Sequence, residues 1–250
     1  MESVLLNKYA VSSIVFLSGC LMPLQSSFAK STLSLEQQLG QKLILDFRYY
    51  CEQGASKQCR TPMTSLPSEL ANIVTKYNIG GVILFSENTQ SIEQTITLNS
   101  QLQTAASKSS SKLPLFISID QEGGRVARLP RDVATSFTGN MSIGATYKKH
   151  GTSFAKKTAT VIAKELNSLG INVNYAPTVD VNMNPDNPVI NVRSFGENPV
   201  LVSKLGAAQV AGFENNGVIT SLKHFPGHGD TNVDSHTGLP KVNHAKEVIY

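Results

Sequence analysis

Three of the five histidines in the chain lie between positions 223 and 240, in a stretch that glycine and proline interrupt repeatedly. Two aspartates lie in the same stretch. Glycine and proline break regular structure, so these side chains belong to a loop, where imidazole and carboxylate groups can exchange protons with a bound molecule. An apolar run of strand length, residues 217–222, comes directly before it. We therefore expect a buried strand whose end delivers Lys223 and His224 to this loop.

Asp234 and His236 have the spacing of a proton-transfer pair. Residues two apart point to the same side of an extended segment. An imidazole with a pKa near 6.5 can give a proton to a leaving oxygen and later take one from water, and a carboxylate on its other nitrogen fixes the tautomer. The loop is therefore a candidate for general acid/base chemistry. Its glycines and prolines suit a segment that moves over a substrate.

A metal site is the alternative interpretation of the same loop. Histidine and aspartate are ligands that zinc and other divalent ions accept. A metal requires fixed ligand geometry, which a loop broken by glycine and proline does not favour, so we prefer the acid/base interpretation. The residues that would form the metal site are His224, His228, Asp230, Asp234 and His236.

Asp120 ends a second apolar run, residues 113–120, and is followed by Gln-Glu-Gly-Gly-Arg-Val. The paired glycines let the backbone turn sharply and approach a ligand. An aspartate at such a turn can accept hydrogen bonds from two neighbouring sugar hydroxyls. Taken alone, the residue is better interpreted as a turn or helix-capping aspartate.

A third polar segment, residues 182–199, contains three Asn-Pro dipeptides. Such a density of turn-forming residues predicts a rigid loop. Arg193 lies in this loop, and its forked guanidinium suits oxygen acceptors. The alternative is a surface arginine paired with Asp180 or Glu197.

The three segments together resemble those of glycoside hydrolase family 3, specifically its β-N-acetylhexosaminidase branch. The match rests on Asp-Gln-Glu-Gly-Gly-Arg-Val from Asp120, on Asn-Pro-Val-Ile-Asn-Val-Arg-Ser-Phe-Gly from Asn187, and on the whole stretch from Lys223. The resemblance implies that Asp234 and His236 are the general acid/base pair. It also implies that the sugar is bound by Asp120, Arg128, Arg193, Lys223 and His224.

The activity implied by this resemblance is exo-acting hydrolysis of terminal β-linked N-acetylglucosamine by a retaining mechanism. Peptidoglycan-derived glycans, or muropeptides, are the implied substrates. The resemblance implies no cofactor and no metal, and it does not make Glu122 the acid. A histidine acid/base also leaves room for attack by phosphate in place of water, so phosphorolysis stays open as a reaction type.

A retaining mechanism needs a nucleophilic carboxylate on the face of the sugar opposite the acid. In the family this aspartate lies in a Ser-Asp segment after a later barrel strand, and no residue of this chain matches it. The resemblance therefore implies a catalytic barrel that is incomplete at its C-terminal end. The alternative function is a catalytically inactive sugar-binding fragment.

Apolar runs of strand length alternate with helical segments along the chain. The strands are expected at 44–47, 80–85, 113–120, 171–176 and 217–222, and the helices at 33–45, 66–77, 91–107, 151–169 and 199–215. This alternation predicts parallel strands in a wound sheet or a barrel. With the resemblance, it predicts a TIM-type (β/α)8 barrel of which residues 30–250 contain about the first five β/α units.

The N-terminal residues have the pattern of an export signal. Lys8 precedes an apolar stretch, residues 9–24, and residues 27–29 offer a small-x-small cleavage site. Residues 1–29 are therefore expected to be a signal peptide. The residues around Cys20 equally resemble a lipobox, which would attach the protein to a membrane through a lipidated Cys20. Either outcome predicts an exported protein, periplasmic or lipid-anchored in the cell envelope; a spanning anchor is less favoured because the apolar stretch is short.

The composition favours a globular protein without a nucleic-acid partner. The 250 residues are 40% hydrophobic, which is enough for a real core. Only 16% are charged, and the net charge of +4 is not concentrated in a Lys/Arg run. Export would place Cys51 and Cys59 in an oxidising compartment, where a disulfide could close their short loop; two free thiols are the alternative.

Overall fold

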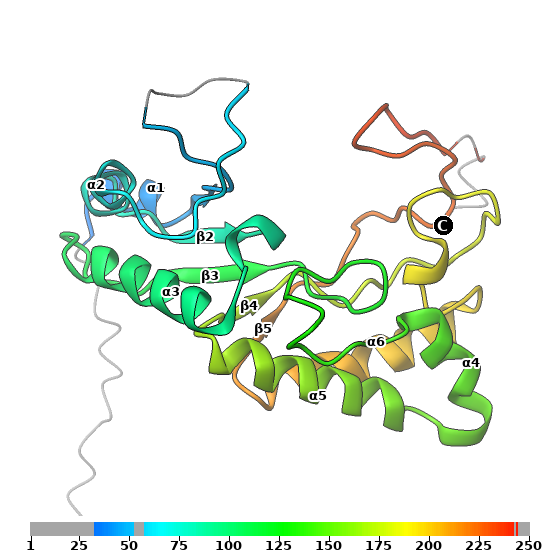
Figure 1. Ribbon diagram of the computed structural model, residues 1–250. Helices are drawn as coiled ribbons and strands as arrows, with labels where there is room; N and C mark the ends of the chain where they lie inside the picture. The colour runs from blue at the N-terminus through cyan, green and yellow to red at the C-terminus, as the bar shows by residue number, and fades with distance from the viewer. Residues whose placement is uncertain (1–32, 53–57, 243, 245–250) are drawn as a thin grey trace, which may run out of the picture. The chain divides into compact units, whose positions relative to one another are not determined.

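Five parallel strands form one sheet, and their order in space is their order along the chain (Figure 1). The computed structural model describes residues 33–52, 58–242 and 244. Each strand lies within an apolar run that the sequence predicts as a strand, so these predictions are confirmed. The strands are β1 (Ile44–Asp46), β2 (Gly81–Leu84), β3 (Phe116–Ile119), β4 (Val173–Asn174) and β5 (Ile219–Thr220).

Six α-helices accompany the strands in the described part of the chain. The segments that the sequence predicts as helices contain all of them except α4. That helix buries only Asn140, Ile143 and Gly144, so it lacks the apolar stripe that marks a helix in a sequence. The helices are α1 (Leu35–Gly40), α2 (Ser68–Lys76), α3 (Ile92–Ser107), α4 (Asn140–His150), α5 (Ser153–Ser168) and α6 (Pro199–Glu214), with 3-10 turns η1 (Ser86–Asn88) and η2 (Asn191–Arg193).

Local side-chain caps fix where several helices begin. The Ser91 hydroxyl accepts a hydrogen bond from the Gln94 backbone at the start of α3. Asn198 caps α6 in the same way and is followed by Pro199, whose missing N–H costs nothing in a first turn. The loop that contains Arg193 therefore ends at a fixed point.

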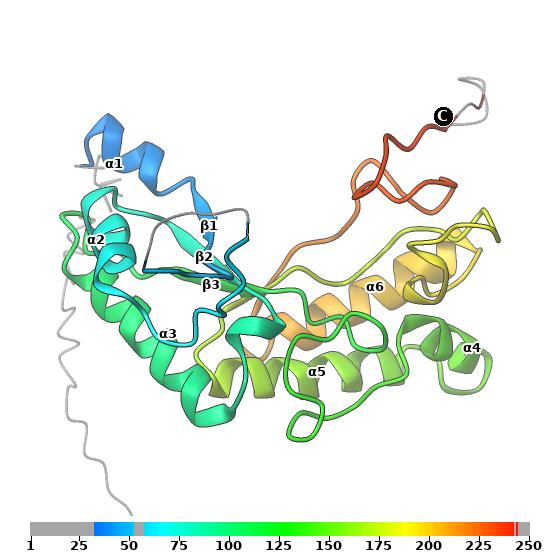
Figure 2. The same cartoon turned by 45° about the horizontal axis from the view of Figure 1, so that its top comes forward.

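The helices α3, α5 and α6 run along one side of the sheet in both views (Figures 1 and 2). Helix α5 also packs against α6, and α2 against α3. A doubly wound sheet reverses its strand order and carries helices on both faces, whereas a barrel wall keeps a sequential order with its helices outside. The arrangement here is that of a barrel wall.

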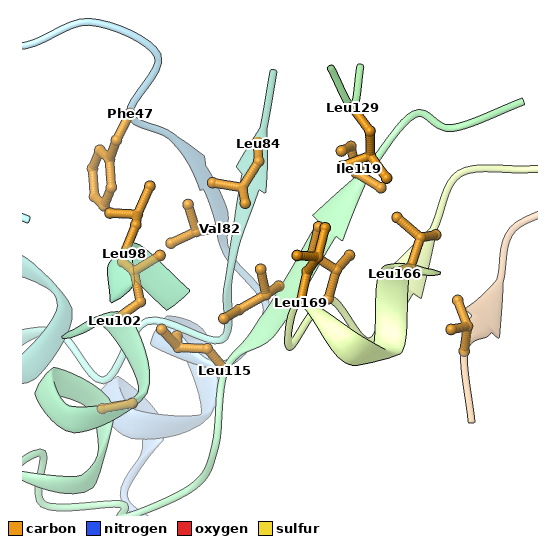
Figure 3. Packing of buried hydrophobic residues seen from close by; sticks show 14 of the residues in the cluster. Phe47, Val82, Leu84, Leu98, Leu102, Leu115, Ile119, Leu129, Leu166 and Leu169 are labelled. Carbon is orange, nitrogen blue, oxygen red and sulfur yellow. The ribbon is translucent and has the colours of Figure 1, made fainter. Parts of the chain in front are cut away.

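The main hydrophobic core lies between the sheet and its helices. Side chains alternate between the two faces of a strand. On the helix side, Val82 of β2 and Ile119 of β3 are fully buried together with Leu98 and Leu102 of α3 (Figure 3).

The opposite face of the sheet is more open. Ile44, Phe116 and Ile219 keep 40%, 45% and 51% of their surfaces exposed. By the alternation along each strand, Phe116 points away from the core side that its neighbour Ile117 occupies. Apolar side chains in this position fill the interior when such a wall closes into a barrel.

The cysteine prediction can be compared directly with the structure. Cys51 and Cys59 form a disulfide with a Cα–Cα distance of 6.0 Å, so the predicted bridge is confirmed over two free thiols. The predicted signal peptide, residues 1–29, and the lipobox at Cys20 lie outside the described residues. Among the helices that the structure describes, none is both long and apolar enough to cross a bilayer.

Leu102→Ala should lower the free energy of unfolding by about 3 kcal/mol, because the fully buried side chain leaves a cavity in a packed core. Ile96→Ala in the same helix is the matched control. Ile96 is 44% exposed and alanine is a good helix former, so this change should stay within about 0.5 kcal/mol. Urea denaturation measures both values, and equal losses would contradict the assignment of the two faces of α3.

Candidate active site

Four charged side chains lie together around one buried carboxylate, which belongs to Glu122. Glu122 accepts hydrogen bonds from Arg193 Nε at 2.9 Å and from Arg193 Nη2 at 2.7 Å, the forked pairing of a guanidinium with a carboxylate. Lys223 Nζ lies 2.6 Å from Glu122 Oε1 and 2.6 Å from Asp120 Oδ1. We call Asp120, Glu122, Arg193 and Lys223 the charged cluster.

The charged cluster is assembled from three distant parts of the chain. Asp120 directly follows β3, and Lys223 lies just beyond β5. Arg193 is the last residue of η2, in the connection from β4 to α6. The carboxyl ends of parallel strands meet at one edge of the sheet, which is the edge where α/β barrels carry their active sites.

The backbone after β3 is held by Asn174, a fully buried residue of β4. Its amide oxygen accepts a hydrogen bond from the Gln121 N–H at 2.9 Å, and its amide nitrogen donates to the Gln121 carbonyl at 2.9 Å. Gly123 and Gly124 then adopt φ angles of +86° and +60°, which other residues disfavour. The predicted sharp turn is therefore present, and it fixes the position of Glu122.

Burial and ion pairing act in opposite directions on Glu122. Its side chain is only 2% exposed, and burial by itself would raise its pKa. The hydrogen bonds from Arg193 and the charges of Lys223 and Arg193 outweigh the burial and hold the pKa of Glu122 below its usual value of 4.5. Burial would lower the pKa of Arg193, but its hydrogen bonds to Glu122 and the charge of that carboxylate raise it. The pair is therefore ionised at neutral pH.

A second buried carboxylate, Asp180, organises the start of the loop after β5. Its Oδ2 lies 2.6 Å from His224 Nδ1, and its Oδ1 accepts a hydrogen bond from the His228 backbone at 2.6 Å. The other ring nitrogen of His224 lies 3.4 Å from Arg193 Nη2. His224 thus connects Asp180 to the charged cluster.

Asp234 and His236 make the contact that their spacing predicts. Asp234 Oδ1 lies 2.7 Å from His236 Nδ1 and accepts a hydrogen bond from the His236 backbone at 2.9 Å. These two hydrogen bonds hold the pKa of Asp234 below its usual value of 3.8, and the bond from the backbone contributes more than the bond from the ring. The His236 side chain is 82% exposed. This pair makes no hydrogen bond or ion pair to the charged cluster within the described residues.

Arg128 differs from the other predicted sugar-binding residues in its surroundings. Its backbone N–H donates to Gln121, and its side-chain charge acts on Glu87. No hydrogen bond or ion pair joins its side chain to the charged cluster in the part of the chain that is described. Of the predicted site residues, the structure brings together Asp120, Arg193, Lys223 and His224.

Sequence reasoning did not assign a site role to Glu122 or Asp180. The resemblance gives Glu122 no acid function, yet a carboxylate between a strand end and paired glycines is a signal that could have found it. The sequence offers Asp180 only as an alternative surface partner of Arg193. Arg193 pairs with Glu122 instead, and Asp180 is 3% exposed and bound to His224.

The site opens into a cleft of about 620 Å³ beside Lys223 and His224, with Val179, Leu222 and Phe225 in its lining. An apolar wall next to polar groups suits a ring with one apolar face and several hydroxyls. The histidines and aspartates of the loop after β5, which could in principle bind a metal, do not form a comparable cluster. Among the described residues, no group of three or more His, Cys, Asp or Glu side chains could hold a metal ion.

The fold and the site together define a class of protein. Forked donors and carboxylates meet at the carboxyl edge of a barrel-type parallel sheet, beside a cleft, which is the arrangement of a barrel enzyme that binds a polar small molecule. Residues 34–250 match the family model for the glycosyl hydrolase family 3 N terminal domain. The chain belongs to glycoside hydrolase family 3.

Known proteins of this family are similar to the chain over most of its length. It is 64% identical over 223 residues to Beta-hexosaminidase A of Pseudoalteromonas piscicida, covering 88% of this chain and 37% of that protein. The family 3 β-N-acetylglucosaminidase from Paenibacillus sp. str. FPU-7 superimposes with a TM-score of 0.75 at 41% identity, covering 87% of this chain and 38% of that one. NagZ from Neisseria gonorrhoeae in complex with N-trifluoroacetyl-D-glucosamine superimposes with a TM-score of 0.70 at 29% sequence identity. The match covers 83% of this chain and 56% of that one.

These similarities confirm the predicted family and fold class. The five-stranded wall is part of a TIM-type barrel like those of the similar structures. The chain spans less than two thirds of the length of each of the three proteins compared.

Glu122→Gln should lower the free energy of unfolding by about 3 kcal/mol at pH 7, because it removes one partner from buried ion pairs. The folded-state pKa of Glu122 is depressed, so its contribution is fully present above the usual value of 4.5 and is lost as the pH falls through the lower folded value. Urea denaturation of both proteins should therefore show a difference that shrinks below about pH 4.5.

Glu197→Gln is the matched control, because it makes the same chemical change at an exposed residue just before α6. It should change stability by less than about 0.5 kcal/mol at either pH. A Glu122→Gln variant as stable as the wild type at pH 7 would show that the buried pairs do not stabilise the fold.

Proposed function

We propose that the protein containing this chain is an exo-acting β-N-acetylhexosaminidase that removes terminal β-linked N-acetylglucosamine. The observation that carries the proposal is the charged cluster beside a cleft, at the carboxyl edge of a family 3 barrel wall. The similar proteins support the substrate class, since one is named a β-hexosaminidase and another is solved with N-trifluoroacetyl-D-glucosamine.

Asp120, Lys223 and His224 are well placed to bind a sugar. The Asp120 side chain is 22% exposed, and its Oδ2 has no hydrogen-bond partner among the described residues, so it can accept a sugar hydroxyl. Lys223 uses two of its three N–H donors on Asp120 and Glu122, which leaves one for the substrate. Arg193 and Arg128 complete the set of sugar-binding residues that we propose.

His236 is the proposed general acid and base. Its Nδ1 is bound to Asp234, so Nε2 is the atom that gives a proton to the glycosidic oxygen and later takes one from water. The ring is largely exposed, whereas proton transfer requires hydrogen-bond distance. The proposal therefore includes closure of the loop over the bound sugar.

A retaining reaction also requires a carboxylate nucleophile on the opposite face of the sugar. We assign this role to no residue of the chain. Asp120 and Glu122 are paired with cations, and Asp180 is held by donors from the β5 loop. A chain that has no nucleophile available would bind the sugar without cleaving it, which is the alternative function.

We extend the proposal to peptidoglycan-derived glycans or muropeptides as substrates, because residues 1–29 have the pattern of an export signal. The mature protein would be periplasmic, or anchored in the cell envelope through a lipidated Cys20. The mass of the N-terminal fragment from protein made in a bacterial host distinguishes a start at Lys30 from an acylated Cys20. An unprocessed Met1 would contradict export.

In the full-length protein, His236→Ala should lower kcat by about 100-fold or more, because general acid catalysis is lost. The loss of kcat/KM, which reports the step in which the leaving group departs, should be greater on N,N′-diacetylchitobiose than on a 4-nitrophenyl β-N-acetylglucosaminide, because a nitrophenolate leaves without protonation and a sugar alkoxide does not. Release of N-acetylglucosamine and of nitrophenolate measures the two rates. Equal losses of kcat/KM on both substrates would contradict a role for His236 as the acid.

Two controls accompany this experiment. His150→Ala changes a histidine of α4 whose ring contacts Phe154, and it should leave both rates unchanged. Dialysis of the wild-type enzyme against a chelator should also leave turnover unchanged. Loss of activity that zinc restores would instead favour the metal-dependent hydrolase.

A further inference from the structure

The buried carboxylate of Asp180 receives three hydrogen bonds from one short segment of chain. Oδ2 accepts from the His224 backbone at 3.2 Å and lies 2.6 Å from the His224 ring, and Oδ1 accepts from the His228 backbone at 2.6 Å. The Asp180 side chain has no exposed surface. Both of its oxygens are therefore committed to the beginning of the loop after β5.

These contacts determine which nitrogen of His224 carries the proton. An ionised carboxylate only accepts hydrogen bonds, so the Nδ1 atom facing Asp180 must bear a hydrogen. On the other side, Nε2 faces Arg193 Nη2 at 3.4 Å, and a guanidinium only donates. A neutral His224 ring thus has a hydrogen on Nδ1 and a lone pair on Nε2, which accepts from Arg193.

Residues 228–231, which we call the stem, are fixed by more than Asp180. Asn187 Nδ2 donates to the His228 carbonyl at 2.7 Å, and Asn184 Nδ2 donates to the Thr231 carbonyl at 3.2 Å. Gly229 packs so closely on the chain that an added Cβ would lie 1.8 Å from the Val181 carbonyl oxygen. The stem is therefore bound to the loop after β4 at several points.

The loop beyond the stem is held differently. Asp234 makes its hydrogen bonds within its own turn, to His236, Thr237 and Gly238. Within the described residues, Asp234 and His236 have no polar contact with the strands or with the charged cluster. Their position relative to the sugar site is consequently set by the stem from which they extend.

We propose that Asp180 is a positioning residue for both halves of the site. It selects the tautomer of His224 on the sugar-binding side, and it fixes the stem from which Asp234 and His236 reach the glycosidic oxygen. This inference rests on the proposed function for its catalytic consequence. The tautomer of His224 does not depend on that function.

The first test needs no activity. Nitrogen-15 NMR of the chain with labelled histidine, assigned with a His224→Gln variant, should show the Nδ1–H tautomer for His224. A neutral ring with its hydrogen on Nε2 would overturn the proposal. Asp180→Asn should weaken the preference of His224 for the Nδ1–H tautomer, because an amide has only one acceptor oxygen, whereas both carboxylate oxygens accept hydrogen bonds from residues 224–228. The exposed Asp186→Asn, on the same loop, is the matched control and should leave the tautomer unchanged.

The second test measures kinetics in the full-length protein. Asp180→Asn should lower kcat by about 100-fold, since small errors in placing a catalytic group cost that much. The control Asp186→Asn should leave kcat unchanged. The double variant Asp180→Asn/His236→Ala should be no slower than His236→Ala, because Asp180 acts on kcat through the loop that carries His236.

The outcomes separate the two proposals. Losses of kcat that multiply in the double variant would mean that Asp180 does not act through His236, and the proposed positioning of the stem would be wrong. A wild-type protein that releases no N-acetylglucosamine would end the proposed function, while the tautomer measurement would still decide the role of Asp180. If Asp180→Asn fails to fold, the wild-type tautomer alone confirms or overturns the assignment.

Discussion

The salt bridge between Glu122 and Arg193, extended by Lys223, is the interaction on which the rest of the site depends. Removing charged groups from water is costly, and a buried ion is tolerated only when partners and hydrogen bonds compensate it. Glu122 lies 71 positions from Arg193, and Lys223 lies 103 positions from Asp120. The turn after β3, the η2 loop and the end of β5 must therefore dock together, because none of them can bury its charge alone.

The barrel wall supplies the rigidity that this docking requires. The ladder between β3 and β4 is short, and asparagine side chains extend it. Asn172 accepts a hydrogen bond from the Ile117 backbone at 2.8 Å and donates to the Leu115 carbonyl at 3.1 Å. At the end of β3 next to the site, Asn174 likewise accepts a hydrogen bond from the Gln121 backbone N–H and donates one to the Gln121 carbonyl. Polar side chains within the sheet thus hold the turn that presents Asp120 and Glu122.

Much of the fold could be predicted from the sequence, because parallel strands are buried on the helix side and read as apolar runs between helical segments. Helix α4 could not, since it buries few apolar side chains. The site was predictable where a motif places a residue at a strand end, as for Asp120 and Lys223. The roles of Glu122 and Asp180 depend on burial and on partners far along the chain, and local spacing contains neither. The difference between the bound stem and the exposed loop beyond it also depends on tertiary contacts, so local spacing could not predict it.

The charge balance of the assembled site bears on the chemistry it can support. Among the residues in mutual contact, Asp120, Glu122 and Asp180 contribute −3 and Lys223 and Arg193 contribute +2, so that their sum is −1 when the His224 ring is neutral. The proposed substrate is a neutral sugar, which would leave this balance unchanged as it displaced water and lowered the local dielectric constant. The transition state of glycoside cleavage resembles an oxocarbenium ion and gains positive charge on the sugar ring. In the proposed reaction, carboxylates held by buried pairs that need no reorganisation would stabilise that charge more than they stabilise the neutral ground state, which is the difference that accelerates a reaction.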